Sequence, residues 1–495
     1  MANTLELLKN EAARTFTENG AVTLNTTQSD CLDLFAMGGA LRNADDEHVK
    51  KIFTDAYAEN PDLALKILFY LRDVRGGLGE RKVFRTMLKA LAEYHPESVV
   101  KNIDYIAEFG RFDDLNCLLE TSVKDKVIEK IKTQLEEDKE ALEKGSEISL
   151  LAKWLPSINA SDKAVVKTAK GIANALGMNC ASYRKLLSAL RRKIKIIENN
   201  LRTKDYSFDY EKQTSKALFK YRKAFVRNDG ERYADFMGKV EKGEVVLKTG
   251  TLYPYDVIAP CFDSSNWSLK SGFTAEERRT MDATWNSLEN FSNSRNALVV
   301  CDVSGSMMGG GTPRPIDISV SLALYFAEHN TGLFKNHFIN FSDKPELVEI
   351  KGKDLVDKVK YVVSSEWGMS TNIEAVFNLV LRTAVKNELR QEDLPESLYI
   401  ISDMEFNECT ENAGLTNFEN AKKKFEEAGY KLPKLIFWNV QSRQNNLPVS
   451  KNEEGVILVS GSSPRIFAMI KDDKLNPYDF MLSVVNSERY EKIVA

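Results

Sequence analysis

Five short apolar runs between residues 291 and 495 constrain the fold of this chain most strongly. Each run is continuous rather than alternating, which is typical of strands buried on both faces of a parallel sheet. Strands that alternate with helices predict a doubly wound parallel sheet, so we expect an α/β domain over residues 291–495. The expected strands are 297–301, 337–341, 398–401, 435–440 and 456–459, and the expected helices are 316–329, 372–386 and 417–428.

The chain before residue 290 has a different pattern, with apolar residues at helical spacing. Pro61 and Pro96 each mark a helix start, and 35 residues separate them. The same interval separates Tyr70 from Tyr105. Such a period is typical of stacked helical hairpins, because each hairpin buries its apolar side only against its neighbours. We therefore predict a helical-repeat (HEAT-like) domain over residues 1–290.

Composition and cysteine usage exclude several classes of protein. The sequence has no apolar run long enough to cross a membrane, and its start lacks the apolar core of a signal peptide. Its six cysteines lie far apart and form no C-x-x-C pair, which is typical of reduced thiols rather than of disulfides or a zinc site. We expect a cytoplasmic protein that makes no membrane contact.

Charge is distributed unevenly along the helical part. Residues 1–150 hold 20 Lys and Arg against 28 Asp and Glu, whereas residues 151–227 hold 18 against 5. A helix over 183–201 combines an apolar stripe with basic residues, and a second basic stretch contains Phe219, Tyr221 and Phe225, which could stack on bases. A basic excess attracts polyanions, but a solvated helix face has the same composition. Both interpretations stay open.

Oxygen-bearing side chains follow the first and third predicted strands. Asp302, Ser304 and Ser306 come directly after the first, and Asp403 comes after the third. Thr371 lies in the loop that opens the second predicted helix. Ligands bind at the carboxyl ends of the strands in such sheets. Two carboxylates and three hydroxyls, without nitrogen or sulfur, suit a hard cation such as Mg²⁺.

The sequence offers little for catalysis. The run Gly309-Gly310-Gly311 is not followed by the lysine of a P-loop, and Gly77-Leu78-Gly79 lacks the third glycine of a dinucleotide site. No G-x-S-x-G nucleophile elbow is present. Beside the predicted metal site, Glu405 alone could serve as a general base. We therefore expect a binding protein and not an enzyme.

The D-x-S-x-S loop at 302–306, the G-x-x-T loop that ends at Thr371, and Asp403 together resemble the metal-ion-dependent adhesion site of von Willebrand factor A domains. The resemblance implies that Ser304, Ser306 and Thr371 bind the metal through their hydroxyls, and that Asp302 and Asp403 act directly or through water. It also implies one open position for a partner's carboxylate or phosphate oxygen. Glu405 departs from the pattern, since a small residue is commoner there, and could compete at the site.

Together with this domain, four stretches resemble the Ro (TROVE) ribonucleoproteins, and still more the related family that joins a Ro-like helical region to a von Willebrand A domain. They are LKILFYLRDVRGGLGER (65–81), FGRFDDL (109–115), KWLPS (153–157) and YRKLLSALR (183–191). The resemblance implies a ring of helical hairpins closed by the A domain, with structured RNA on a basic outer surface and single-stranded ends in the central hole. The implied phosphate contacts are Arg184, Lys185, Arg191, Arg192 and Lys195.

Two functions remain open at this point. One is a Ro-like protein that binds small noncoding or single-stranded RNA. The other is a metal-dependent adaptor that captures an acidic protein partner through the A domain, without RNA. The segment 72–77 also has two interpretations. Arg72 and Arg75 could pair with acids between neighbouring repeats, or Arg75 and Arg81 could touch RNA at the hole.

Overall fold

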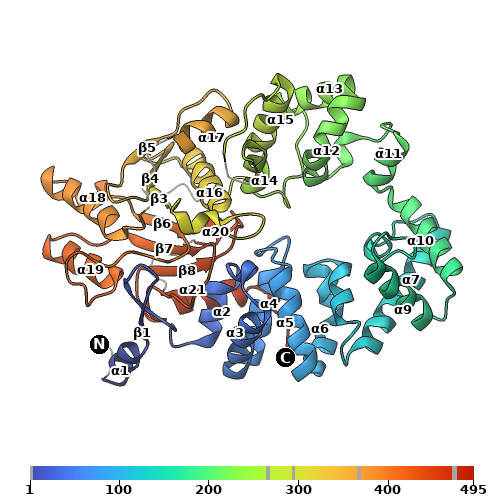
Figure 1. The fold of residues 1–495 in the computed structure, drawn as a ribbon, viewed down its shortest axis with the longest axis horizontal. Coiled ribbons are helices and arrows are strands. Elements are labelled where there is room, and N and C mark those ends of the chain that lie inside the picture. The colour runs from blue at the N-terminus through green and yellow to red at the C-terminus, as the bar shows by residue number, and fades with distance from the viewer. Residues whose placement is uncertain (1–3, 264–267, 293–295, 365–369, 471–475) are drawn as a thin grey trace.

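The computed structural model describes residues 4–263, 268–292, 296–364, 370–470 and 476–495. Helices dominate the chain up to residue 290, apart from one hairpin near its start, and an α/β part follows (Figure 1). The predicted class, a helical region joined to an α/β domain, is confirmed. No helix within the described ranges is long and apolar enough to cross a membrane.

A small hairpin of β1 (Arg14–Phe16) and β2 (Val22–Leu24) follows the first helix of the helical region. Its helices are α1 (Thr4–Ala12), α2 (Asp30–Gly38), α3 (Asp46–Glu59), α4 (Pro61–Arg72), α5 (Lys82–Tyr94), α6 (Pro96–Phe109), α7 (Lys124–Glu143) and α8 (Leu151–Trp154). They continue with α9 (Lys163–Ala175), α10 (Cys180–Ile194), α11 (Ile197–Thr203), α12 (Ser215–Asn228), α13 (Gly230–Glu241), α14 (Pro254–Ile258) and α15 (Ala275–Asn286).

Local signals explain where these helices begin. The side chain of Asn60 accepts a hydrogen bond from the backbone N–H of Leu63, and Pro61 occupies the first turn of α4. Helix α6 likewise starts at Pro96. Helix α3 packs on α4 and α5, and α5 packs on α6, so these helices form stacked hairpins. Their buried stripes supply the core of this part, as the periodicity predicts.

The α/β part contains one sheet in the order β5-β4-β3-β6-β7-β8. Its strands are β3 (Ala297–Cys301), β4 (His337–Asn340), β5 (Leu347–Glu349), β6 (Ser397–Ser402), β7 (Lys434–Asn439) and β8 (Val456–Ser460). All neighbours are parallel except β5, which pairs antiparallel with β4. The five predicted strands are parallel to one another, as predicted, and the antiparallel edge strand β5 is an addition that the sequence analysis did not predict. The apolar-run criterion misses β5 because two of its three residues are exposed.

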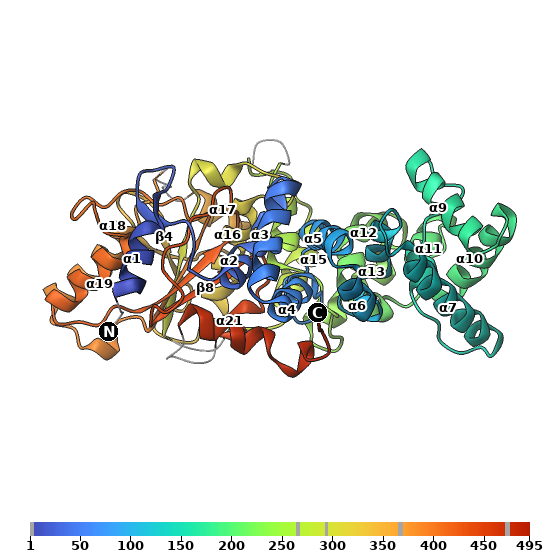
Figure 2. The same cartoon turned by 90° about the horizontal axis from the view of Figure 1, so that it is seen from below.

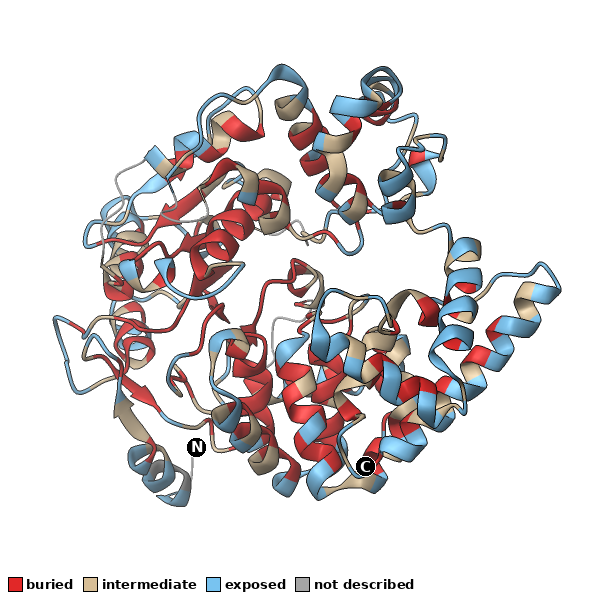
Figure 3. Ribbon diagram, turned by 45° about the vertical axis from the view of Figure 1, so that its right-hand side comes forward, coloured by how far each residue is buried: buried red, intermediate tan, exposed pale blue. Residues whose placement is uncertain are grey.

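Helices surround this sheet. They are α16 (Pro315–His329), α17 (Leu355–Ser364), α18 (Ile373–Lys386), α19 (Asn417–Glu427), α20 (Ile466–Met469) and α21 (Pro477–Val485). Helix α16 packs across β3, β4 and β6, whereas α2 and α21 pack on β8. Figure 3 shows the parallel strands buried along almost their whole length, while exposed residues prevail on the edge strand β5 and on the helices farthest from the sheet.

The helical region contacts the α/β part at both of its ends. Helix α2 packs on β8, and α14 packs on α16. Between these contacts the chain passes through α7, α9 and α10, at the opposite end of the molecule in Figures 1 and 2. The elements thus form a closed ring, with the α/β part as one segment of it.

The end of the described chain returns to the first repeats. The guanidinium of Arg489 donates to Asp73 at 2.7 Å, and the hydroxyl of Tyr490 donates to the same carboxylate at 3.0 Å. Further on, the side-chain amide of Asn102 donates to the carbonyl of Val494 at 2.6 Å. These contacts fix the segment after α21 against α4 and α6.

Candidate metal centre and nucleic-acid interface

The switch point of the sheet lies between β3 and β6. The chain leaves β3 towards β4 and β5, then returns to build β6, β7 and β8 on the other side. Cys301 is paired with Ile401 across the two parallel strands, and the backbone N–H of Asp302 donates to the carbonyl of Ile401 at 3.1 Å. Asp302 and Asp403 therefore emerge side by side, at the place where open α/β sheets bind ligands.

A hydrogen-bonded cluster surrounds Asp302. Its Oδ1 accepts the backbone N–H of Ser304 at 2.9 Å, and its Oδ2 accepts the hydroxyl of Ser402 at 2.5 Å. The hydroxyl oxygens of Ser304 and Ser306 lie 3.0 Å apart, and Ser306 also hydrogen-bonds Asp403. Asp302 and Asp403 are only 1% and 2% exposed. The structure thus brings four of the five predicted ligands together.

Thr371, the fifth predicted ligand, borders this cluster. Its hydroxyl donates to the carbonyl of Glu405 at 2.6 Å and accepts the side-chain amide of Asn19 at 3.1 Å. Glu405 is two residues after Asp403, so the threonine lies beside the loop that carries the second aspartate. Its hydroxyl is bonded to protein groups here. Gly368 of the predicted G-x-x-T loop lies outside the described residues.

Electrostatics at this edge favour a bound cation. Burial raises the pKa of Asp302, and the charge of Asp403 raises it further. Burial also raises the pKa of Asp403, against a hydrogen bond from Ser306 and the charge of Arg443, whose Nη2 lies 3.0 Å from its Oδ2. One guanidinium cannot neutralise two buried carboxylates. The donor set therefore fits a hard divalent cation in charge and in ligand type.

Glu405, expected as a competitor for the metal, has another set of partners. Its Oε1 accepts the side-chain amide of Asn446 at 2.8 Å, and its Oε2 accepts the backbone N–H of Glu18 at 2.8 Å. Across the described residues, no group of three or more histidine, cysteine, aspartate and glutamate side chains is arranged to hold a metal ion. A cation here would depend on the serine and threonine hydroxyls in addition to two carboxylates.

The N-terminal hairpin covers this edge of the sheet. The hydroxyl of Thr17 donates to the carbonyl of Phe406 at 2.7 Å, and the side-chain amide of Asn19 donates to the carbonyl of Glu405 at 2.7 Å. Figures 1 and 2 both show the hairpin beside α19, to which Arg14 is bonded. Sequence reasoning misses Thr17 and Asn19, because Asn19 and Glu405 are 386 positions apart and no local spacing links them.

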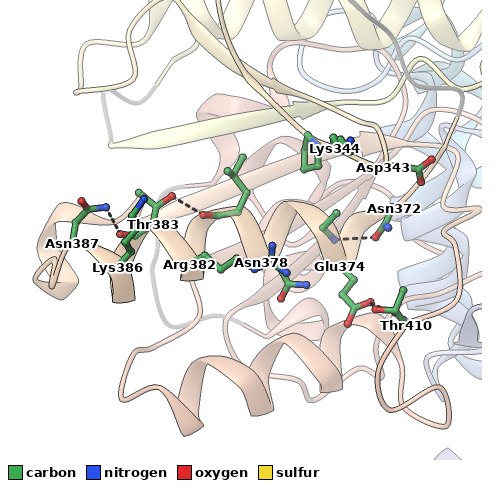
Figure 4. Close-up of a pocket in the computed structure, with 13 residues that line it drawn as sticks. Asp343, Lys344, Asn372, Glu374, Asn378, Arg382, Thr383, Lys386, Asn387 and Thr410 are labelled. Carbon is green, nitrogen blue, oxygen red and sulfur yellow. Dashed lines mark hydrogen bonds between the residues drawn. The ribbon is translucent and has the colours of Figure 1, made fainter.

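A polar groove of about 560 Å³ lies along α18, which begins two residues after Thr371. Figure 4 shows Asn378, Arg382 and Lys386 along the groove, with Asn372 at the N-terminal end of α18. Glu374, at the same end, accepts the backbone N–H of Thr410 at 2.7 Å. The spacing of four residues places these polar side chains in one row.

The basic helix of the sequence analysis is α10. Its apolar stripe is buried through Tyr183, Leu187 and Leu190, so the predicted amphipathic pattern is confirmed. Four of the five predicted phosphate contacts are exposed, and no hydrogen-bond or ion-pair partner of their side chains lies in the described part of the chain. They are Arg184, Lys185, Arg192 and Lys195.

Arg191, the fifth, is placed differently. Its guanidinium donates to the carbonyls of Ala152 and Leu155 at 2.8 and 2.7 Å, and to the hydroxyl of Ser157 at 2.7 Å. Burial lowers its pKa. Arg191 therefore clamps the KWLPS segment to α10, and its donors are already used. Arg191 is not free for phosphate because it faces α8, and the spacing of residues in the sequence does not show this.

Two of the three aromatic residues of the second basic stretch are not available for stacking, and the third, Tyr221, is half-buried and donates its hydroxyl to Glu198 at 3.1 Å. Phe219 and Phe225 on α12 are buried. Lys216 and Lys223 form ion pairs with Asp256 at 3.0 Å and Glu277 at 3.2 Å. This part of the predicted RNA surface is thus a packed and partly neutralised interface between helices. The expectation that the two phenylalanines stack on bases is wrong.

The segment after α4 forms an interior ion pair. Nε of Arg72 donates to Asp114 at 2.8 Å, and these side chains are 2% and 0% exposed. A Cβ on Gly110 would lie 2.4 Å from that carboxylate, so only glycine permits the approach. Arg75 donates to the carbonyl of Glu108 at 2.7 Å. The pairing interpretation is confirmed for Arg72, whereas Arg75 contacts backbone instead of an acid.

A second surface, from which sequence reasoning selected only Arg81, lies along α5. It is a cleft of about 1140 Å³ that contains Arg81, and a basic residue at every fourth position is the signal that could have found it. Its basic residues are Lys50, Arg81, Lys82, Arg85 and Lys89, and its acidic residues are Asp46, Glu93, Asp113 and Glu120. The near balance of charges makes this cleft less suited to a polyanion than α10.

Comparison with known proteins adds a family and a fold. A family model described as a domain of unknown function (DUF2828) matches residues 17–134 and 178–291, and another (DUF7788) matches residues 296–489. An uncharacterised protein, L728, of Acanthamoeba polyphaga mimivirus is 30% identical over 512 residues, which cover 95% of this chain and 87% of that protein.

A solved structure is similar over most of the chain. The crystal structure of the Deinococcus radiodurans RO (RSR) protein superposes with a TM-score of 0.51, at 12% identity, over 93% of this chain and all of that one. At this identity the likeness concerns the fold. The Ro-like arrangement expected from the four sequence stretches is therefore confirmed as a fold.

Proposed function

This chain belongs to the same family as the mimivirus protein L728, and we propose that it is a Ro-like RNA-binding protein of the ribonucleoprotein type. The sequence resemblance implies this role, and the Ro-like fold supports it. The observation that carries the proposal is the exposed basic face of α10. Its four cations, Arg184, Lys185, Arg192 and Lys195, are left without partners among the described residues.

Phosphate groups would satisfy these side chains. An arginine fork can donate two parallel hydrogen bonds to one phosphate, and each neutralised phosphate releases counterions. Few acidic residues lie near α10 in the sequence, since residues 151–227 hold 5 Asp and Glu against 18 Lys and Arg. The face thus offers a polyanion a charge excess that the nearly charge-balanced cleft along α5 lacks.

We also propose that Asp302, Ser304, Ser306, Thr371 and Asp403 hold a divalent cation, with Mg²⁺ as the best match to their chemistry. A bound cation would offer an open position to a carboxylate or phosphate oxygen. The chain's own part is to hold the oxygens in place through the bonds around Asp302 and to exclude water by burial. We propose a binding role and no catalysis.

The test is the salt dependence of RNA binding. Arg184→Glu/Arg192→Glu is expected to weaken binding of a fluorescent single-stranded RNA by about tenfold or more at moderate salt. The slope of log affinity against log salt concentration is expected to become less steep by about 1.4, because each lost phosphate contact reduces its magnitude by roughly 0.7. Fluorescence anisotropy over a salt series measures both quantities.

Lys335→Glu/Lys492→Glu is the matched control, because it makes the same change in net charge at two exposed lysines away from α10. It should leave both affinity and slope close to wild type. Equal weakening by the two double variants would show that only net charge matters, and α10 would not be the site. If wild type binds RNA poorly but loses a protein partner on Asp302→Ala, the adaptor function replaces the RNA-binding proposal.

A further inference from the structure

We propose that the groove along α18 binds an extended acidic peptide segment of a protein partner, with its acidic side chains at alternate positions. This site is separate from the basic face of α10, and it needs no metal ion. It therefore goes beyond the proposed function, and each can fail without the other. Three features support it: the face of α18 that lines the groove, the charge balance of the lining, and the spacing of its cations.

One face of α18 lines the groove. Its residues there recur at helical spacing, and they are Ala375, Asn378, Leu379, Arg382, Thr383 and Lys386. A different face of the helix is buried, through Ile373, Phe377 and Ala384. The loop after β4 adds residues 343–345 to the lining, as Figure 4 shows for the first two of them. The helix is thus anchored on one side and leaves the groove side to a ligand.

The cations of the groove are left to such a ligand. They are exposed, and they are Lys344, Arg382 and Lys386. Among the residues that the structure describes, their side chains have no hydrogen-bond or ion-pair partner. Arg390, four positions after Lys386, instead pairs with Asp393 at 3.1 Å. The groove therefore offers three cationic groups to a negatively charged partner.

The acids of the lining do not cancel this charge. Glu374 is 4% exposed, and its carboxylate lies 2.7 Å from Nζ of Lys424. The same carboxylate accepts the backbone N–H and the hydroxyl of Thr410 at 2.7 and 2.8 Å. Asp343 is the other acid of the lining, and three cations face it. The groove thus keeps an excess of two positive charges, which favours an acidic ligand.

The spacing of the cations fits an extended chain. Arg382 and Lys386 are four residues apart on α18, which separates them by about 6 Å along the helix axis. Alternate side chains of an extended peptide are about 6.6 Å apart. An acidic side chain at every second position can thus meet one cation after the other. From Ala375 to Lys386 the face is about 16 Å long, which accommodates about five extended residues.

The lining favours a peptide over a nucleic acid. None of the described residues that line the groove is aromatic, so bases would find no ring to stack on. The exposed carboxylate of Asp343 would repel a continuous row of phosphates, whereas a peptide can place an uncharged residue beside it. Leu379 offers apolar contact to the side chains between the acids, and the amide of Asn378 can bond a peptide backbone.

The test measures binding of two fluorescein-labelled peptides to the full chain by fluorescence anisotropy. The first alternates its acids (Ser-Glu-Thr-Glu-Thr-Glu-Ser), and the second has the same composition with its acids adjacent (Ser-Thr-Glu-Glu-Glu-Thr-Ser). Wild type is expected to bind the first at least about threefold more tightly. Arg382→Glu/Lys386→Glu is expected to weaken that binding by about tenfold or more, because two attractions become repulsions. Equal affinity of wild type for both peptides would contradict the extended register.

Two further variants serve as controls. Lys242→Glu/Lys492→Glu makes the same change in net charge at two exposed lysines outside α18, and it should change the affinity less than twofold. Arg382→Lys/Lys386→Arg keeps both charges and should stay within about threefold of wild type. Equal weakening by the two glutamate variants would show that net charge alone acts, and the groove would not be the site.

The remaining outcomes identify another occupant or another site. Peptide binding is expected to persist in EDTA and in Asp302→Asn. Loss of binding under either condition would place the peptide at the metal loops and overturn the inference. Displacement of the peptide by a single-stranded oligouridine would make the groove a nucleic-acid site and overturn it as well.

Discussion

Asp302→Asn is expected to lose divalent-cation binding, with an affinity at least about 100-fold below wild type. Even outer-shell partners of metal ligands cost 10–100-fold when they are replaced, and Asp302 is one of only two carboxylates in the proposed set. Asparagine keeps the shape and can still accept the backbone N–H of Ser304. A fold defect is therefore not expected to mimic the loss. Calorimetric titration with Mg²⁺ or Mn²⁺ measures it.

The same variant is expected to be more stable than wild type when metal is removed. Burial and Asp403 raise the pKa of Asp302, so its ionised form costs stability once the pH exceeds its ordinary value. The gain in Asp302→Asn should thus be largest above neutral pH, on the order of 1–2 kcal/mol. It should shrink as the pH falls towards 4, where unfolded aspartate also takes up its proton.

Thermal unfolding in EDTA and in Mg²⁺ distinguishes the two effects. At a Mg²⁺ concentration 100 times its Kd, wild type should gain about 2.7 kcal/mol, whereas the variant should gain nothing. Ser321→Ala is a useful control, because its buried hydroxyl bonds within α16, away from the site. Equal stabilisation of wild type and Asp302→Asn by Mg²⁺ would contradict the proposed ligand set.

Asp114→Ala is expected to destabilise the helical region by about 3–5 kcal/mol. Asp114 accepts Nε of Arg72 on one oxygen and Nε of Arg85 on the other, at 2.8 and 2.7 Å. Its removal leaves the guanidinium of Arg72 buried without its ion pair. Urea unfolding followed by circular dichroism measures the change.

Asp104→Ala is the matched control, since Asp104 pairs with Lys130 at the surface and is 67% exposed. It should cost less than about 1 kcal/mol. Asp114→Leu/Arg72→Met should recover part of the loss, because apolar pairs often replace buried ion pairs without penalty. If Asp114→Ala costs no more than Asp104→Ala, the interior pair is not a stabilising element.

The sequence predicts the α/β part well because its signals are local. The run at 297–301 matches β3 residue for residue, and the predicted helix at 316–329 is α16 within one residue. Asp302, Ser304 and Ser306 follow directly from that strand, so their convergence could be foreseen. The edge strand β5 could not be found by the apolar-run criterion, because it is mostly exposed. Helix α17 is also missed, although its buried residues Leu355, Val356, Val359 and Val362 have helical spacing.

Contacts between distant parts of the chain could not be predicted. Arg191 has the same charge and neighbourhood in the sequence as Arg192, yet the fold turns one towards α8 and leaves the other exposed. Glu18, Asn19 and Arg443 carry no motif, and only the folded chain brings them to the metal loops. Helical periodicity shows which side of a helix is apolar, but not which polar residue has a partner.

The hydrogen bonds from Arg489 and Tyr490 to Asp73 have a consequence for the folding of this protein during synthesis. Arg489 and Tyr490 bond to that carboxylate from 416 and 417 positions further along the chain. During synthesis on the ribosome, Asp73 cannot form these bonds until residues 489 and 490 have been made. Such distant pairing slows folding and leaves early segments open to aggregation. Newborn chains should thus depend on chaperones until the last stretch emerges.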